Sequence, residues 1–361
     1  MKKEFKVIIA CLFVANLSVT AGNKDRQGQA GAGDLLINPY ARTSGMAGAN
    51  VASVYGIEAQ YLNVAGIAQT RKTEVLFTRT AWLRGTDINI NAFGLTQRVG
   101  ESGVMGVGFN SMSFGEIPIT TTQNPDGGIG TFNPTFTNIN LSYAKEFSNS
   151  IYGGVNLKAI SHRGAADIRA SGVAIDAGIQ YVTTLGKKNV ENKEMFGNNV
   201  HFGIAIKNVG APLQYKGDGL NTKGTLFETE RTLTLVQRAN AFEMPTLLNI
   251  AGAYDLYLLK DKADHKIAFA FNFQANSFSQ NQLQGGLEYG FRKMFMIRGG
   301  LNYEKNIFNE TLSTSVLAGP TAGFTVELPI SKSGSTFGLD YGFRATNRFG
   351  GCHSIGARIN L

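Results

Sequence analysis

Charged residues are scarce in this sequence of 361 residues. Asp, Glu, Lys and Arg make up 17% of the chain, whereas they make up about a quarter of an ordinary soluble domain. Glycine is abundant, with 44 residues, and hydrophobic residues account for 43%. This balance is typical of a protein that is not surrounded by water alone.

Cysteine is almost absent, since the chain contains only Cys11 and Cys352. Cys11 falls in the N-terminal leader predicted below, so its removal would leave a single thiol. One thiol cannot form an intramolecular disulfide, which excludes a disulfide-stapled scaffold.

Residues that carry chemistry are few and scattered. The four histidines show no metal-ligand spacing and no HExxH motif, and G-x-S-x-G is missing. Cys352 and His353 are neighbours in a predicted strand and should point to opposite faces. We therefore expect no enzyme activity, no metal site and no cofactor. The histidines are His162, His201, His265 and His353.

Glycine and acidic residues also fail to form a site. The segment GVMGVG at 103–108 resembles a phosphate-binding loop, but it lies inside a predicted strand without a following helix. Its glycines instead predict that this strand closely approaches another segment inside the protein. Asp176 and Glu288 alternate with apolar residues and are predicted to face a lumen.

Long hydrophobic runs are also lacking, apart from VIIACLFVANLSV near the N-terminus. Basic residues precede this run, and the small residues Val19 and Ala21 precede Gly22, which predicts a signal peptide over residues 1–21. No other run approaches the length of about 18 residues that a spanning helix needs. The Lys and Arg residues behind the net charge of +8 are dispersed, which argues against nucleic-acid binding.

Alternation with a period of two residues dominates the rest of the chain. In HKIAFAFNFQAN, one face carries Ile267, Phe269, Phe271 and Phe273, and the other carries small or polar residues. Side chains alternate between the two faces of a strand, so this element has one apolar face and one small or polar face.

About fourteen such segments occur, most of them long enough to cross a bilayer as tilted strands. An even number of strands and two long connections of the same parity, at 115–134 and 210–245, are typical of bacterial outer-membrane barrels. We predict an all-β, transmembrane antiparallel β-barrel over residues 73–361. The predicted strands are 74–84, 86–98, 102–114, 135–147, 150–162, 168–183, 199–209, 246–257, 265–276, 280–293, 294–304, 313–328, 335–346 and 351–361.

The segment before the barrel, residues 22–72, is predicted to be a hatch that folds into the lumen. Its stretch from Ala41 to Ala68, ARTSGMAGANVASVYGIEAQYLNVAGIA, is rich in small residues that allow close packing against a wall. A loose linker is the alternative, but the stretch is too apolar for a solvated one. The apolar residues are Val51, Val54, Tyr55, Ile57, Tyr61, Leu62 and Ile67.

This stretch resembles the N-terminal part of the PorV/PorQ family of Bacteroidetes outer-membrane proteins, which typically reads ARAMGMGGAFVAVADDVSALYWNPAGLA. One departure is Val64, where the family usually has Pro. Among the matching residues, we assign six to the hatch. They are Arg42, Gly45, Met46, Gly48, Asn63 and Gly66.

The resemblance implies a FadL-like barrel of about fourteen strands in the cell outer membrane and a part in the type IX secretion system. PorV-like members accept cargo proteins as they leave the translocon, and PorQ-like members belong to the attachment assembly. The implied partners are therefore cargo proteins or secretion-system subunits, together with outer-membrane lipid.

The loop at 210–245 carries many apolar residues for a surface loop, which is typical of a partner contact. We predict that this loop, with 115–134, contacts cargo or a translocon subunit; a lid that packs on the barrel rim is the alternative. The segment TLTLV within the loop is predicted as an additional strand. The predicted contact residues are Phe227, Leu233, Leu235, Val236, Phe242 and Met244.

Two other functions compete with protein secretion. A FadL-like channel for hydrophobic small molecules would need an apolar path and a lateral gap, for which glycines at 285–286 and 299–300 could provide a kink. An outer-membrane enzyme would need a nucleophile and a base, which the sequence does not bring together.

Overall fold

The computed structural model describes residues 26, 28–165, 167–185, 199–225, 231–259, 262–309, 311–332 and 334–361. Within these ranges, fourteen antiparallel strands form one closed barrel in which each strand pairs with its neighbours along the chain, and β1 pairs with β18. All fourteen predicted strands are confirmed, with ends that shift by a few residues.

The barrel strands are β1 (Thr73–Ala81), β2 (Asn89–Val99), β3 (Gly103–Ser113), β6 (Thr135–Ser148), β7 (Ile151–Arg163), β8 (Arg169–Thr183), β9 (Val200–Gly210), β12 (Leu247–Leu259), β13 (Lys262–Asn276), β14 (Gln282–Phe291), β15 (Phe295–Tyr303), β16 (Leu317–Pro329), β17 (Thr336–Thr346) and β18 (Cys352–Asn360). Two small hairpins lie outside the barrel: β4 (Ile117–Pro118) with β5 (Thr131–Phe132), and β10 (Asn221–Thr225) with β11 (Thr232–Val236).

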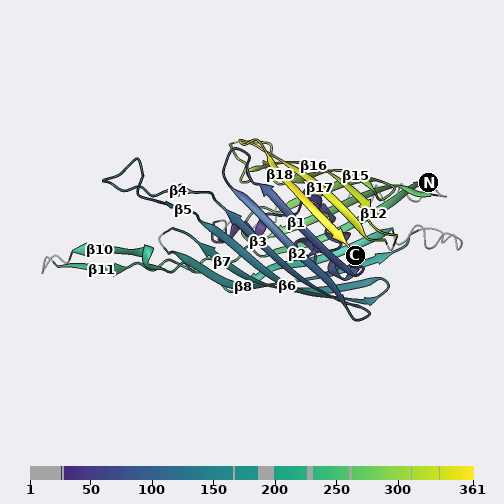
Figure 1. Ribbon diagram of the computed structural model, residues 1–361, viewed down its shortest axis with the longest axis horizontal. Coiled ribbons are helices and arrows are strands. Elements are labelled where there is room, and N and C mark those ends of the chain that lie inside the picture. Colours follow the sequence, from purple (N-terminus) through teal and green to yellow (C-terminus); the bar gives the residue numbers. More distant parts are fainter. Residues whose placement is uncertain are drawn as a thin grey trace.

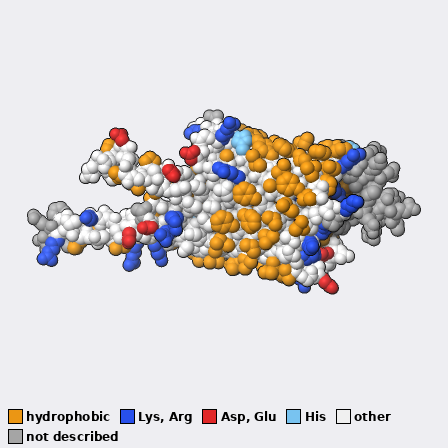
Figure 2. All heavy atoms as spheres, in the orientation of Figure 1, with side chains coloured by type: hydrophobic (Ala, Val, Ile, Leu, Met, Phe, Trp, Pro, Cys, Tyr) orange, Lys and Arg blue, Asp and Glu red, His pale blue; other side chains and the backbone are white. Residues whose placement is uncertain are grey.

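The outer surface of the barrel is apolar and its inner surface is small or polar. On β13, Phe269 and Phe271 are 46% and 49% exposed, whereas the intervening Ala270 and the next residue, Asn272, are buried. Figure 2 shows apolar side chains gathered over the barrel strands, with charged side chains mainly toward the two ends. A bilayer is the solvent that such a surface requires.

The two ends of the barrel differ in the length of their connections. One end, which we name the long-loop end, carries connections that include 114–134 and 211–246, and both small hairpins project from it (Figure 1). The opposite end, the short-turn end, carries tight turns such as 100–102 and 149–150. Most of the connection between β8 and β9, residues 186–198, lies outside the described residues.

Short helices fill the lumen. Before β1, the described residues form η3 (Gly33–Leu36), α2 (Ala41–Ser44), η4 (Ala49–Ala52), α3 (Ala59–Leu62) and η5 (Val64–Gln69). The helix α2 contacts β16–β18, η4 contacts β9 and β12–β14, and η5 contacts β3 and β6–β8. We name residues 33–69 the hatch; the predicted internal hatch is thus present.

One further short helix, η7 (Asp218–Leu220), lies in the loop at 211–246. None of the helices in the described part of the chain has the length and apolar character to cross a bilayer.

Glycines in the wall let the hatch approach closely. A Cβ atom on Gly300 of β15 would lie 2.6 Å from the carbonyl carbon of Met46, so no larger residue fits without movement. Gly94 and Gly108 meet Ile57 and Gln60 in the same way. The role predicted for the glycines at 103–108 is therefore confirmed at Gly108.

Polar side chains also join the hatch to the wall. The Asn63 amide donates to the carbonyl oxygens of Val51, 3.2 Å away, and of Ile179 in β8, 3.1 Å away. The Gln180 amide donates to the carbonyl oxygens of Val51 and Val54 at 3.1 and 3.0 Å. The bonds to Val51 and Val54 satisfy backbone groups that the short helices leave unpaired inside the barrel.

The glycine contacts predict an asymmetric response to valine substitution on β15. Gly300→Val should displace the hatch and destabilise the protein by about 1–3 kcal/mol, because the added atoms overlap the backbone at Met46. Gly299→Val is the matched control, since the nearest atom to its Cβ would be 3.7 Å away. Heat-modifiable migration in SDS gels and limited proteolysis of the hatch measure the effect; equal behaviour of the two variants would contradict the prediction.

Candidate functional site

Two cavities lie against the hatch in the described part of the structure, and Tyr61 of α3 lines both. The larger cavity, of about 400 Å³, reaches loop residues such as Ser279 and Thr314 at the long-loop end, and we name it the vestibule. The smaller one, of about 40 Å³, lies between the hatch and strands β2, β3, β6 and β7, and we name it the inner cavity.

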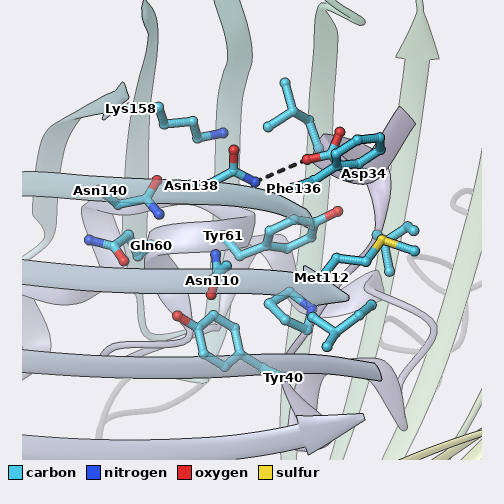
Figure 3. A pocket seen from close by; sticks show the side chains of 14 residues that line it. Asp34, Tyr40, Gln60, Tyr61, Asn110, Met112, Phe136, Asn138, Asn140 and Lys158 are labelled. Atoms are coloured by element: carbon cyan, nitrogen blue, oxygen red, sulfur yellow. Dashed lines mark hydrogen bonds between the residues drawn. The ribbon is translucent and has the colours of Figure 1, made fainter. Parts of the chain in front are cut away.

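Polar side chains share the lining of the inner cavity with apolar ones such as Ile90 and Met112. Figure 3 shows Gln60, Asn110, Asn140 and Tyr61 around it, with the Asn138 amide donating to an Asp34 carboxylate oxygen 3.2 Å away. A volume of about 40 Å³ accommodates water molecules rather than an organic molecule. In the described conformation the hatch therefore closes this side of the lumen.

The vestibule has one wall made of side-chain amides from β12, β13, β14 and β15. They interlock, because the Gln282 side-chain oxygen accepts from Asn302 at 3.1 Å and from Gln274 at 3.3 Å. The Gln282 amide in turn donates to Glu304, 3.0 Å away. The amides that line the wall are Asn249, Gln274, Asn276, Gln282, Gln284 and Asn302.

The hatch and the long-loop end contribute apolar and aromatic surface to the vestibule. Trp82 lies just after β1, and Tyr61 stands on the hatch. Each ring makes a cation–π contact with a buried basic side chain. Lys207 Nζ lies 3.6 Å from the centroid of the Tyr61 ring, and the Arg344 guanidinium lies 4.9 Å from the centroid of the Trp82 ring. The aliphatic residues that line the vestibule include Leu36, Ile37, Leu62, Val316 and Leu317.

The barrel wall is irregular beside the vestibule. The register between β16 and β17 shifts between Leu317 and Thr321, and Gly319, with φ of 100°, lies in this bulge. Both Gly319 and Pro320 line the vestibule. Glycines 285–286 and 299–300 instead pair in unbroken register, so the kink considered there is absent from these paired segments.

A lid closes over the start of the hatch. Leu213 and Met244 from the loop at 211–246 are buried against Leu35, and Phe242 packs beside them. The backbone also joins the two segments, since Gly31 N donates to the Glu243 carbonyl oxygen at 3.0 Å. The entrance to the hatch is thus covered by the same loop that carries β10 and β11.

Asp34 anchors the lid and the wall to the hatch. Its carboxylate lies 3.1 Å from His162 Nε2 in β7, and His162 Nδ1 lies 3.3 Å from the Tyr215 hydroxyl in the loop. The Phe136 ring stacks on His162 at 4.0 Å. Burial, and then the nearby Asp34 charge, raise the pKa of Tyr215, so its hydroxyl keeps its proton.

The residues predicted for partner contact separate into two groups. Phe242 and Met244 belong to the lid, which matches the alternative interpretation of this loop. Leu233, Leu235 and Val236 lie on β11 and are 43%, 51% and 73% exposed, and the predicted TLTLV strand is confirmed. Phe227 lies outside the described residues. A contact between this hairpin and a partner stays a prediction.

The hatch residues taken from the sequence occupy structural positions. Arg42 and Glu58 form a buried ion pair of 2.9 Å, and the Arg42 guanidinium also donates to the Tyr55 carbonyl oxygen at 2.9 Å. Asn63 caps η5, because its side-chain oxygen accepts from Ala65 N. Val64 is the first residue of η5, a position that accepts Pro or other residues.

The four other assigned residues pack closely. A Cβ atom on Gly45 would touch Arg298 and Gly323, and one on Gly48 would touch Gln284. Met46 meets Gly286 and Gly300, while Gly66 faces the Val54 carbonyl.

Catalytic groups do not converge in the described residues, which contain no cluster of three metal-ligating side chains. Cys352 is buried and accepts a hydrogen bond from Leu83 N, and His353 contacts the Tyr341 hydroxyl at 2.8 Å. Asp176 faces the lumen as predicted, paired with Lys158 at 2.7 Å, and Glu288 pairs with Arg298 at 2.8 Å.

The vestibule is the part of the site that sequence reasoning missed. The alternation predicts that Asn272 and Gln274 lie on the polar face of their strand, but it does not predict their hydrogen bonds to Asn249 of β12 and to Gln284 and Gln282 of β14. The signal was present as amides on the face opposite the apolar stripe in four consecutive strands.

The buried ion pair of the hatch predicts a large effect of single substitution. Arg42→Met should destabilise the protein by about 3–5 kcal/mol, because it leaves the Glu58 carboxylate buried without its cation. The double variant Arg42→Met/Glu58→Leu should regain most of this loss. Urea unfolding followed by Trp82 fluorescence compares them, and a single variant as stable as the wild type would refute the expectation.

Comparison with solved structures identifies the fold. The chain is similar to the CymD monoaromatic hydrocarbon channel, with 14% identity, a TM-score of 0.51 and coverage of 94% of this chain and 97% of that one. It is also similar to the Pseudomonas putida toluene transporter TodX, with 13% identity, a TM-score of 0.52 and coverage of 89% and 96%.

No family model matches the sequence, and no curated protein matches it either. The likeness to CymD and TodX therefore concerns the fold. The chain shares with these channels the architecture of a closed transmembrane barrel, as the alternating sequence predicted.

Proposed function

We propose that this chain is an outer-membrane channel for small organic molecules, closed by its hatch in the described conformation. The observation that carries the proposal is the vestibule of about 400 Å³, which is bounded by the hatch inside a closed barrel. Ligand pockets usually measure about 300–1,000 Å³, so one small molecule fits.

The orientation follows from the loops. Bacterial outer-membrane barrels carry their longer loops outside the cell, so the long-loop end with its projecting hairpins is extracellular (Figure 1). The vestibule then receives molecules from outside. Residues 1–21, proposed as a signal peptide, would direct the chain across the inner membrane.

The solved channels with this fold support a substrate that has an apolar face. CymD is described as a monoaromatic hydrocarbon channel and TodX as a toluene transporter. In this chain, Trp82, Tyr61 and the aliphatic residues beside them offer a surface for one face of a ring-sized molecule. This corresponds to the FadL-like channel considered for the sequence.

Passage requires movement. The hatch bounds the vestibule, so a molecule there continues either through displacement of the hatch or sideways through the wall. The bulge at Leu317–Thr321 is the described irregularity that borders the vestibule, and it is the proposed place for lateral exit.

A disulfide between hatch and wall tests the channel. Ala49 of η4 and Gly286 of β14 suit this purpose, since a Cβ atom on Gly286 would lie 3.3 Å from Ala49 Cβ, close to the separation in disulfides of about 3.5–4.5 Å. In a background with Cys11 and Cys352 replaced by alanine, Ala49→Cys/Gly286→Cys should lose solute flux when oxidised and regain it when reduced.

Proteoliposome flux of benzyl alcohol and of methyl β-D-glucopyranoside measures the outcome. The single variants Ala49→Cys and Gly286→Cys are the controls, because they alter packing without a cross-link. Flux that is equal in the oxidised and reduced double variant would contradict gating by the hatch.

A second proposal is a role in type IX protein secretion, as the PorV/PorQ resemblance implies. The observation that favours it is the hairpin β10–β11, which projects from the barrel (Figure 1). Leu233, Leu235 and Val236 are exposed on β11 of this hairpin. Exposed apolar patches often mark protein contacts. Cargo proteins or secretion-system subunits would be the partners.

Removal of residues 222–236 should leave the barrel folded and abolish recovery of these partners in pull-downs from native membranes. The deletion is compatible with the lid, because Asn221 and Val236 pair and the buried Leu213 and Met244 are retained. The triple variant Leu233→Ser/Leu235→Ser/Val236→Ser keeps the hairpin and should have the same effect. Undiminished recovery of partners with both variants would end this second proposal.

A further inference from the structure

The amide wall of the vestibule is organised in two rows. Strand register places Asn249 opposite Gln274 and Gln274 opposite Gln282, and Glu304 follows as the acceptor from Gln282. The second row joins Gln284 and Asn302, which are also register partners. The buried Asn272, the register partner of Gln284 on β13, supports this row by donating to the Gln284 side-chain oxygen, 2.8 Å away. Four neighbouring strands therefore present hydrogen-bonding groups at two adjacent levels, which a single polar substitution would not produce.

These rows can serve a ligand as both donors and acceptors. Each amide carries an NH₂ group and a carbonyl oxygen, and Glu304 adds a buried carboxylate whose described hydrogen bonds come from Gln282 and Thr314. A hydroxyl group is the ligand counterpart, because it donates one hydrogen bond and accepts others.

Several polar atoms around the vestibule have no hydrogen-bond partner in the described part of the chain. Arg344 is 6% exposed, and its Nε and Nη2 atoms meet no acceptor; the Asn302 side-chain oxygen meets no donor. These atoms are enclosed by protein, so the polar groups that a vestibule ligand meets are the amides and the Glu304 carboxylate. A pure hydrocarbon would desolvate those groups without offering them hydrogen bonds, which is unfavourable.

The opposite side of the vestibule is aromatic and aliphatic. Trp82 and Tyr61 present ring surfaces, and Leu36 and Val316 lie beside them. A ring compound with hydroxyl groups has C–H surface for such rings and oxygen atoms for an amide wall. Only a ligand with both an apolar face and several hydroxyl groups would contact both the aromatic side and the amide wall of the vestibule.

From this arrangement we infer that the vestibule binds a small ring compound with several hydroxyl groups, of the size and chemistry of a monosaccharide. The ring would pack on Trp82, and the hydroxyl groups would bond to the rows that contain Gln282 and Asn302. This inference rests on the proposed channel function and names its substrate class. The amides of the inner cavity, Asn110 and Asn140 among them, offer the same chemistry on β3 and β6.

Tryptophan fluorescence tests the inference directly, because Trp82 is the one tryptophan of the chain and lines the vestibule. The protein is placed in phospholipid nanodiscs, which avoids detergents with sugar headgroups, and titrated with methyl β-D-glucopyranoside. We expect a saturable change in emission. Toluene should give no saturable change at concentrations up to tenfold above the half-saturation point of the glucoside.

Gln282→Leu should weaken glucoside binding at least tenfold, because Gln282 joins the two rows and bonds to Glu304. Asn302→Leu should act in the same direction and covers the case in which the first variant fails to fold. The matched control is Gln97→Leu, an amide-to-leucine change at an exposed position of β2, which should bind like the wild type. Heat-modifiable migration confirms folding of each variant.

Saturable binding of toluene without binding of the glucoside would overturn the inference, as would wild-type affinity in both folded amide variants. These results would leave the channel proposal intact, because the disulfide experiment measures flux rather than recognition. Conversely, the glucoside could bind while solute flux is the same in the oxidised and reduced double variant. That result would support the proposed binding site and contradict gating by the hatch.

Discussion

Backbone hydrogen bonding in lipid is the constraint on which the rest of this structure depends. A strand edge that faces hydrocarbon has no water to bond with, so β1 must pair with β18, and that pairing closes the sheet. Fourteen strands around one axis leave a lumen too wide for wall side chains alone to fill. The hatch occupies this space, and wall glycines such as Gly300 set how closely it packs.

The same closure separates two chemistries on every strand. The outward residues meet lipid and are apolar, as Phe269 and Phe271 show, while inward residues such as Asn272 meet the hatch or a cavity. Polar inward residues that touch the hatch hold it, as Gln180 does. Those beyond its edge form the amide wall of the vestibule. Inward-facing residues of the barrel therefore have one of two roles. Those that contact the hatch support it, and those that line the vestibule face a ligand.

The strand positions, the closure of the barrel and the internal hatch could be predicted from the sequence, because they depend on local patterns. Alternation with a period of two residues predicts strands, and a segment of small residues predicts close packing inside the barrel. The contacts across the barrel did not. Gln282 bonds to Glu304 and Asn302 through a register that depends on the turns between strands, and no local pattern states that register. Likewise, Phe242 and Leu235 lie in one apolar loop sequence, yet only the fold separates the lid from the hairpin.

The position of the seam has a consequence for assembly. The hatch precedes all fourteen strands in the chain, and β18, which completes the wall beside β1, comes last. A nascent sheet can therefore curl around segment 33–69 while it is still open, and no threading through a finished ring is needed. The contacts of α2 with β16–β18 can form only as that last arc arrives. Closure of the cylinder therefore completes the seating of a plug whose η4 and η5 contacts involve earlier strands.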